Sequence, residues 1–234
     1  MNSSTRIKRI MKDLKIIKNL RLENEGIYTY VNDQDIGKIY VMIIGTEGTP
    51  YEHGYYFFEI TMPSDYPLSP PKFIFRTTDG IIRFNPNLYT NGKVCLSIIN
   101  TWNGPGWVPT LTLDKILITI QSMILNEYSL KNEPGLEDSS VEDIEKYNEI
   151  IRWYNYSFSI LDVINVLDEN YKYFIPIMNK LFIEKYDMFM KRFIEFSKHK
   201  LIYMECKYFN LSATPDYKLL QKKYTEKFNK IKKK

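Results

Sequence analysis

Four short runs rich in aromatic and β-branched residues follow one another between residues 27 and 75, and they limit the possible folds more than any other feature. The runs are GIYTYVN (26–32), KIYVMIIG (38–45), YYFFEITMP (55–63) and KFIFRT (72–77). Asn, Asp, Gly and Pro separate them, which is typical of β-strands joined by turns. Because the gaps are short, neighbouring runs are expected to pair. The sequence therefore predicts an antiparallel meander of four strands.

Helical spacing flanks this meander on both sides. An amphipathic helix is expected near the N-terminus, where Ser3, Ser4 or Thr5 can cap apolar positions Ile7, Ile10, Met11, Leu14 and Ile17. A second helix is expected over residues 113–125, capped by Thr112, and a further helical region over about 140–168.

The rest of the chain is predicted to be helical throughout. Pro176 is placed to begin one helix and Pro215 precedes the last one, and both helices carry aromatic stripes that are typical of packing. We therefore expect an α+β fold. Residues 1–165 would hold the N-terminal helix, the four-stranded antiparallel meander, a long loop and further helices, and residues 166–234 would form a helical C-terminal extension.

Charge and cysteine content exclude several classes of protein. The net charge is +4, from 32 basic and 28 acidic residues, which gives no reason to expect a nucleic-acid partner. The longest uncharged apolar run, residues 116–125, is too short to span a membrane, and the N-terminus lacks the apolar core of a signal peptide. Two distant cysteines make no disulfide framework, so cytosol or nucleus is expected. With two histidines and no paired-cysteine motif, neither a metal nor another cofactor is expected.

The basic C-terminal stretch, residues 221–234, holds seven lysines against Glu226. We interpret it as the solvated end of a helix, with an electrostatic contact as the alternative.

One of the two cysteines, Cys95, lies in an unusual setting. Residues 77–111 show neither strand nor helix periodicity and are punctuated by Gly and Pro, and Cys95 lies among them. Free cysteine is among the most buried residue types, so a structural role is the first interpretation. Long irregular segments within compact domains, however, are often functional. Neither His53 nor His199 lies in this stretch, so a Cys–His protease arrangement has little support.

A thiol without a neighbouring base can still exchange acyl groups. When a thiolate attacks a thioester a similar thiolate leaves, so strong activation is not needed. Asn87 lies shortly before Cys95, and its amide can donate a hydrogen bond to a developing oxyanion without proton transfer. The pair indicates acyl transfer through a tetrahedral intermediate.

The same stretch resembles the active-site region of ubiquitin-conjugating enzymes. Asn85-Pro86-Asn87 is similar to the family's His-Pro-Asn motif, and LYTNGKVCLSI (88–98) follows at the family's spacing to its cysteine. RIMKDL (9–14) resembles the family's first helix, and residues 45–75 resemble its paired strands and its Tyr-Pro…Pro-Pro loop. The resemblance covers about residues 1–165. It implies the ubiquitin-conjugating (UBC) fold there, and an enzyme that carries ubiquitin or a ubiquitin-like protein as a thioester.

Within the family the sequence is most similar to the Z type. RFNPN (83–87), TWNGPGWVPT (101–110) and NEPG (132–135) resemble that group. The Z type also has Asn in place of the motif's His, extra residues between Cys and Trp, and a helical C-terminal extension. The giant inhibitor-of-apoptosis conjugating enzyme shares part of the pattern and is an alternative relative.

The resemblance assigns roles in the active site position by position. Cys95 would form the thioester, and Asn87 would support the oxyanion or its own loop. Asn85 and Pro86 belong to that loop, and Asn85 replaces a histidine whose family role is mainly to order it. Lys131 would stand after the second helix, at the position beside the incoming acceptor lysine.

The resemblance also assigns partner surfaces. Leu68, Pro109 and Thr110 match the two loops that contact ubiquitin ligases, although ordinary loop packing would explain Leu68 and Pro109 nearly as well. Arg9 and Lys12 match the face of the first helix used by the activating enzyme. The implied partners are ubiquitin or a ubiquitin-like protein, an activating enzyme, a ligase and a protein substrate.

Two competing functions use the same fold. A non-catalytic ubiquitin-binding variant would lack the cysteine, so Cys95 argues against it. A scaffold that acts through the helical extension, with residual catalysis, is the other alternative. A charging assay with activating enzyme and ATP would separate all three.

Overall fold

The computed structural model describes residues 3–198 and 202–233. It contains five α-helices and six strands along this part of the chain. The helices are α1 Ser3–Leu20, α2 Leu113–Thr119, α3 Val141–Tyr154, α4 Ile175–Phe196 and α5 Tyr217–Lys232, and the strands are β1 Ile27–Val31, β2 Lys38–Ile44, β3 Tyr55–Thr61, β4 Lys72–Phe75, β5 Met204–Cys206 and β6 Leu211–Ala213.

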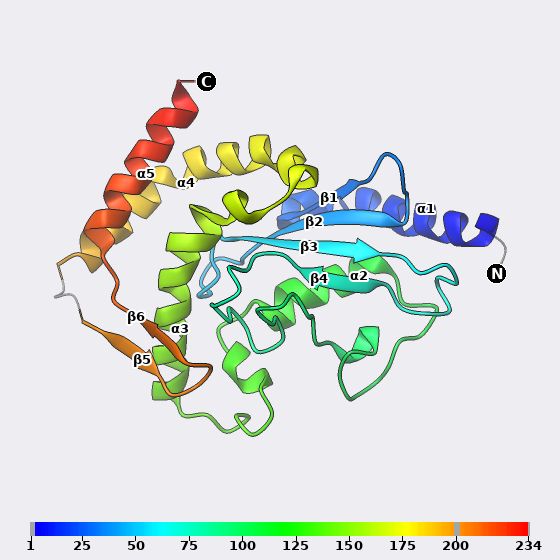
Figure 1. Cartoon of the computed structure of the whole chain (residues 1–234), viewed down its shortest axis with the longest axis horizontal. Helices are drawn as coiled ribbons and strands as arrows, with labels where there is room; N and C mark the ends of the chain where they lie inside the picture. The colour runs from blue at the N-terminus through cyan, green and yellow to red at the C-terminus, as the bar shows by residue number, and fades with distance from the viewer. Residues whose placement is uncertain (1–2, 199–201, 234) are drawn as a thin grey trace.

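The four predicted strands form one antiparallel sheet in sequence order, β1-β2-β3-β4. This confirms the meander (Figure 1). The helix predicted over residues 113–125 is also present, although its second half, Ile120–Ile124, is a π-helix. The region expected over 140–168 is α3 followed by a π-helical turn, Asn155–Ile160, and a short 3-10 turn, Val163–Val166.

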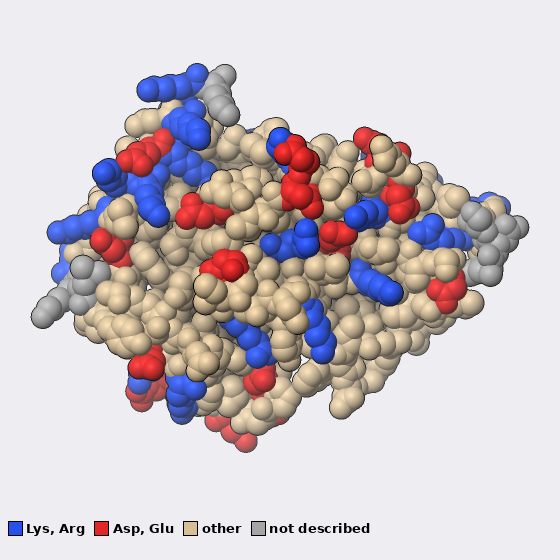
Figure 2. All heavy atoms as spheres, viewed as in Figure 1, with Lys and Arg blue, Asp and Glu red and all other residues tan. Residues whose placement is uncertain are grey.

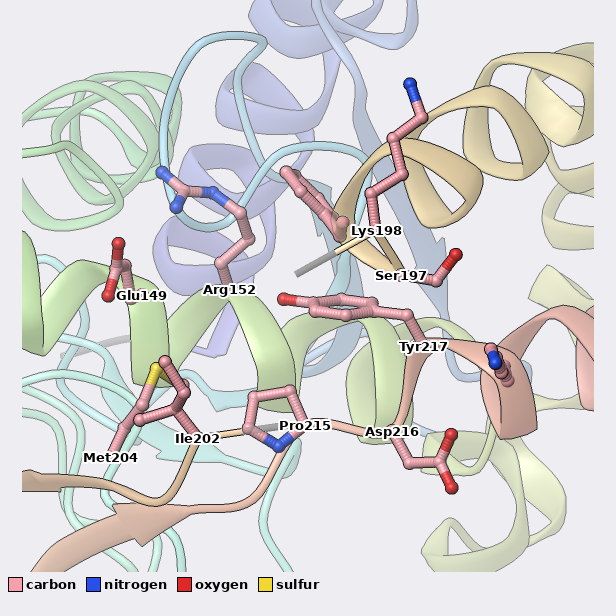
Figure 3. A pocket seen from close by; sticks show the side chains of 11 residues that line it. Glu149, Arg152, Ser197, Lys198, Ile202, Met204, Pro215, Asp216 and Tyr217 are labelled. Atoms are coloured by element: carbon pink, nitrogen blue, oxygen red, sulfur yellow. The ribbon is translucent and has the colours of Figure 1, made fainter. Parts of the chain in front are cut away.

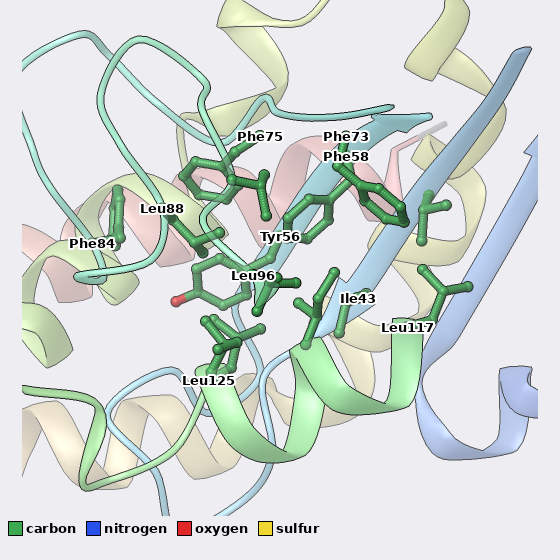
Figure 4. Close-up of a cluster of buried hydrophobic side chains, with 14 of the residues drawn as sticks. Ile43, Tyr56, Phe58, Phe73, Phe75, Phe84, Leu88, Leu96, Leu117 and Leu125 are labelled. Atoms are coloured by element: carbon green, nitrogen blue, oxygen red, sulfur yellow. The ribbon is translucent and has the colours of Figure 1, made fainter. Parts of the chain in front are cut away.

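Both faces of the central strands are buried. Because side chains alternate along a strand, β2 and β3 each send one set of apolar residues to either side of the sheet. The inner set packs with α1 and α2 and comprises Ile39, Val41, Ile43, Tyr56, Phe58 and Ile60. Figure 4 shows this inner core around Ile43, Tyr56, Phe58 and Leu117.

The C-terminal extension covers the outer face of the sheet. Tyr40, Met42, Tyr55 and Phe57 point to this side and pack with aromatic residues of α4, α5 and the 3-10 turn Glu169–Phe174. In Figure 1, α4 lies along the side of the sheet opposite α2, and α5 crosses the end of α4. The described residues of the extension therefore share a buried core with the strands of the first 165 residues.

The prediction that the remainder is helical throughout was wrong. Between α4 and α5 the chain forms a hairpin, β5 paired antiparallel with β6, which packs on α3. Each strand has only three residues, too few for a period of two to be visible in the sequence. Cys206 and Leu211 of this hairpin are buried in the inner core.

An ion pair joins the extension to the core. Arg192 on α4 contacts the carboxylate of Glu52, in the β2–β3 connection, at 2.9 Å. Burial raises the pKa of Glu52, but hydrogen bonds from His53, Arg192 and the backbone of Gly48 outweigh it and hold the pKa at about 2. Glu52 is therefore ionised in the folded protein over nearly the whole pH range.

This pair predicts a specific acid sensitivity. The folded pKa of Glu52 lies below its ordinary value of 4.5, so the pair's stabilisation is present above pH 4.5 and is lost as the pH falls toward 2. We expect Arg192→Gln to lower the free energy of unfolding by about 2 kcal/mol at pH 7 and by less at pH 2.5. Urea unfolding at both pH values measures this. The exposed neighbour Lys191→Gln is the control, and equal losses for Arg192→Gln at both pH values would contradict the account.

The basic C-terminal stretch is only partly solvated. Lysine side chains gather around the outer end of α5, as Figure 2 shows. Lys227, however, points inward and donates to the carbonyl oxygen of Ile160 at 2.6 Å, and desolvation lowers its pKa to about 8.

Among the helices of the described residues, none combines the length and the apolar character that a membrane span requires.

Candidate active site

The irregular stretch between β4 and α2 is anchored in the inner core. Phe84, Leu88 and Leu96 are buried there (Figure 4). Gly92 brings the stretch against β4, where its carbonyl accepts from the N–H of Phe75 at 2.8 Å. Its φ is +88°, and an added Cβ would lie 3.0 Å from the carbonyl oxygen of Phe75, so only glycine fits without strain. The part of the loop around Cys95 is therefore held against the inner core and β4.

Cys95 differs from its neighbours in the direction of its side chain. Val94 and Leu96 are both part of the inner core, whereas Cys95 between them is not. Since alternate side chains of an extended segment point to opposite sides, the thiol of Cys95 points away from that core. The residue is nevertheless only 2% exposed. Cys95 is therefore buried without belonging to the inner core.

Asn87 connects the cysteine to two other segments. Its side-chain amide donates to the carbonyl of Cys95 at 2.9 Å, and its own carbonyl accepts from the N–H of Cys95 at 2.8 Å. The side-chain oxygen of Asn87 accepts from Asn132 at 3.0 Å. An amide NH2 group has two donors, so one remains for an oxyanion formed at Cys95.

Asn85 is fully buried and bonds the Cys95 loop to neighbouring segments. Its side-chain oxygen accepts from the N–H of Asn87 at 2.8 Å. Its amide donates to the hydroxyl of Tyr51 at 3.0 Å and to the carbonyl of Ile124 at 2.7 Å. Asn85 thereby joins the Asn85-Pro86-Asn87 segment to two segments that are distant in sequence. The contact with Tyr51 was not predicted from the sequence.

The turn after α2, Ser129–Asn132, provides the partner that sequence reasoning missed. The side chain of Lys131 is exposed, while that of the next residue, Asn132, is the one bonded to Asn87. Asn132 also donates to the carbonyl of Met123 at 3.3 Å, which fixes the turn to the end of the helix. NEPG (132–135) marked this turn in the sequence, but its contact with Asn87 depends on the tertiary fold.

The residues expected to contact a ligase lie on two loops that are tied together. Leu68 is 62% exposed, and Pro109 and Thr110 are exposed as well. The indole of Trp107 donates to the carbonyl of Pro67 at 2.8 Å, which joins the two loops beneath these residues. The structure therefore brings Leu68 and Pro109 to one side of the molecule as an exposed surface.

Arg9 and Lys12 occupy different environments on α1. The guanidinium of Arg9 bonds to Asp13 on its own helix and to the carbonyls of Pro109 and Leu111, so it fastens α1 to the second of these loops. Lys12 is exposed. A contact of either residue with an activating enzyme stays a prediction.

Cys206 lacks the surroundings of Cys95. It is buried in the inner core, and burial raises the pKa of its thiol. Since the thiolate is the nucleophilic form, Cys206 is poorly suited to acyl transfer.

A cavity of about 640 Å³ lies between α3, β5 and the start of α5, lined by residues such as Arg152, Met204 and Tyr217 (Figure 3). None of its lining residues belongs to the Cys95 loop.

Glu47, Glu52 and His53 lie close enough together to suggest a cation site. However, the guanidinium of Arg192 already occupies Glu52. His199 lies outside the described residues.

An asparagine network, anchored by the buried Asn85, holds a cysteine loop on a four-stranded meander, and this is consistent with the resemblance seen in the sequence. A profile of the ubiquitin-conjugating enzyme family matches residues 9–152, and the chain belongs to this family. The ubiquitin-conjugating enzymes E2 Z of Xenopus tropicalis and Homo sapiens are each 39% identical to it over 166 residues, or 70% of this chain. This confirms the expected Z-type character.

Other matches agree with this placement. A putative ubiquitin-conjugating enzyme E2 39 of Arabidopsis thaliana is 45% identical over 138 residues, covering 57% of this chain and 42% of that protein. A ubiquitin-conjugating enzyme E2 domain from Toxoplasma gondii has a TM-score of 0.51 and 27% identity, covering 65% of this chain and 97% of that one. The E2 Z proteins are longer, since the matched region covers 53% of the Xenopus sequence and 47% of the human one. The UBC fold is confirmed.

Proposed function

We propose that this protein accepts ubiquitin, or a ubiquitin-like protein, from an activating enzyme as a thioester on Cys95. It then transfers the modifier to a lysine of a substrate, usually together with a ligase. The observation that carries the proposal is the Asn87–Cys95 pair: a thiol turned away from the core, beside an amide with one free donor. Membership of the ubiquitin-conjugating enzyme family indicates which acyl group is transferred, namely that of ubiquitin or a ubiquitin-like protein.

The remaining site residues have supporting roles in this proposal. Asn85 and Pro86 hold the loop, and Lys131 lies near the path of the acceptor lysine on the turn that bonds Asn87. Leu68, Pro109 and Thr110 form the ligase surface. Arg9 and Lys12 contribute to the activating-enzyme surface, Lys12 directly and Arg9 by fixing the loop at Pro109.

The chain divides by role in the same proposal. Residues 1–165 carry out catalysis, and residues 166–234 stabilise that part by covering the outer face of its sheet. With two free, distant cysteines the protein is suited to the reducing cytosol or nucleus. The alternatives, a non-catalytic binder or a scaffold, are less well supported, because neither needs the Asn87–Cys95 arrangement.

The test is a charging reaction with the full chain. It is mixed with ATP and with activating enzymes that load ubiquitin or ubiquitin-like proteins, and the products are separated on non-reducing gels. We expect one adduct that disappears when a thiol reductant is added. Absence of an adduct with every modifier would overturn the proposal.

A further inference from the structure

Arg83 lies at the base of the Cys95 loop and connects it to the turn after α2. Its guanidinium donates to the carbonyl of Pro86 at 2.7 Å and to the carboxylate of Glu133 at 3.0 Å. Pro86 immediately precedes Asn87, and Glu133 immediately follows Asn132, the partner of Asn87. Arg83 therefore holds both segments that position the Asn87 side chain.

The orientation of Arg83 is set by aromatic rings as well as by these hydrogen bonds. Its guanidinium carbon lies 4.1 Å from the ring centre of Tyr89 and 4.4 Å from that of Phe209. Its Nε is buried and has no hydrogen-bond partner among the described residues. Ring contacts at these distances are attractive and favour one plane of the guanidinium.

Phe209 comes from the C-terminal extension, far along the chain. It lies in the four-residue turn between β5 and β6, and its ring also meets that of Tyr147 on α3 edge to face. The hydroxyl of Tyr147 donates to the carbonyl of Phe84, next to Arg83 and Asn85. Phe209 at the hairpin tip therefore contacts the Cys95 loop directly through Arg83 and indirectly through Tyr147.

The backbone of Phe209 is strained. Its φ is +59°, and the next residue, Asn210, has φ +51°. Asparagine tolerates this left-handed region, but a bulky aromatic residue rarely occurs there. Such strain persists where the surrounding structure imposes it, and it clusters at functional sites. Glycine at position 209 would adopt this backbone conformation more easily. The turn geometry therefore does not explain why residue 209 is a phenylalanine.

We propose that Phe209 is a positioning residue for acyl transfer: the hairpin of the C-terminal extension uses this ring to set Arg83, and through Arg83 the Asn87 side chain beside Cys95. The inference rests on the proposed function for its catalytic consequence. It gives the extension a role in the reaction in addition to covering the sheet.

The first test distinguishes the effect of the Phe209 ring from the effect of the turn backbone. Phe209→Gly removes the ring and relieves the backbone strain, whereas Asn210→Gly changes the same turn and keeps the ring. We expect Phe209→Gly to slow discharge of the thioester to free lysine about tenfold, with charging unchanged. Asn210→Gly and Phe209→Tyr should stay within about twofold of the wild type, since both keep the ring over Arg83. Equal discharge rates for Phe209→Gly and Asn210→Gly would overturn the proposal.

A double-mutant cycle tests the route through Arg83. If Phe209 acts by setting Arg83, Phe209→Gly should cause no further loss in an Arg83→Gln background. Losses that multiply would show that the two residues act independently, and the proposal would be wrong.

A second measurement does not depend on charging. Hydrogen exchange of the Asn87 and Cys95 amides, which donate within the loop, reports directly on how firmly the loop is held. Exchange should be faster in Phe209→Gly than in Asn210→Gly. If the wild type forms no thioester, the proposed function falls, but this exchange difference would still support the placement of the loop by Phe209. Identical exchange in both variants would refute it.

Discussion

Asn87→Ala is expected to slow discharge of the Cys95 thioester to free lysine by about 10²–10³-fold. The variant removes the donor that remains available to the oxyanion, and it removes the bond to the carbonyl of Cys95. Charging should be affected much less, because exchange between similar thiols is the easier reaction. Single-turnover measurements of both steps, with the modifier supplied by an activating enzyme, give the comparison.

Asn132→Ala is the matched control for this prediction. It removes the group that orients Asn87 and leaves the amide of Asn87 in place. We expect a smaller loss of about fivefold in discharge, since one neutral hydrogen bond is worth about 1 kcal/mol. If Asn87→Ala reduced charging and discharge equally, Asn87 would only shape its loop.

Phe182→Ala is expected to lower the free energy of unfolding by about 3–5 kcal/mol. Phe182 is fully buried in the aromatic cluster that covers the outer face of the sheet, with the ring of Tyr224 at 5.2 Å and that of Phe189 at 6.3 Å. Removal of its ring leaves a cavity between α4 and α5 that packed helices cannot fill. Ile194→Ala on the same helix is the control, since Ile194 is 52% exposed and should change stability by less than about 0.5 kcal/mol.

The same variant tests how the two parts of the chain are coupled. Tyr55 and Phe57 of the sheet are buried by the extension, so loss of the extension's packing should destabilise the sheet too. We expect one urea transition, shifted to a lower midpoint, when far-ultraviolet circular dichroism and tyrosine fluorescence are followed together. Two transitions, only one of them shifted, would show that residues 166–234 unfold as an independent domain.

Much of the fold could be predicted because its signals are local. The strands are marked by aromatic and β-branched runs between turn residues, and α1 and α2 by one apolar face each. The runs in β2 and β3 are apolar on nearly every residue, which is typical of strands buried on both faces. Nothing local to those runs, however, indicated that α4 and the turn Glu169–Phe174 would cover the second face.

The hairpin of β5 and β6 could not be predicted for a related reason. Its strands are three residues long, and its turn carries Phe209 with a left-handed backbone, contrary to the usual preference for glycine or asparagine. Local preference and tertiary packing disagree at this residue. Such disagreements are expected at functional or strained positions.

The candidate site was predictable where the family motif is contiguous. Cys95, Asn87, Asn85 and Pro86 were found from one stretch of sequence. Asn132 and Arg83 were missed, because their contacts join segments that meet only after folding.

The central claim is that Cys95 carries the acyl group, and peptide mapping of the charged protein by mass spectrometry tests it most directly. Wild type and Cys206→Ser should each gain one reductant-sensitive adduct that maps to the peptide containing residue 95. Cys95→Ala should gain none, and Cys95→Lys, if charged, should form an isopeptide that survives reductant. The account would be contradicted if the adduct persisted in Cys95→Ala or disappeared in Cys206→Ser.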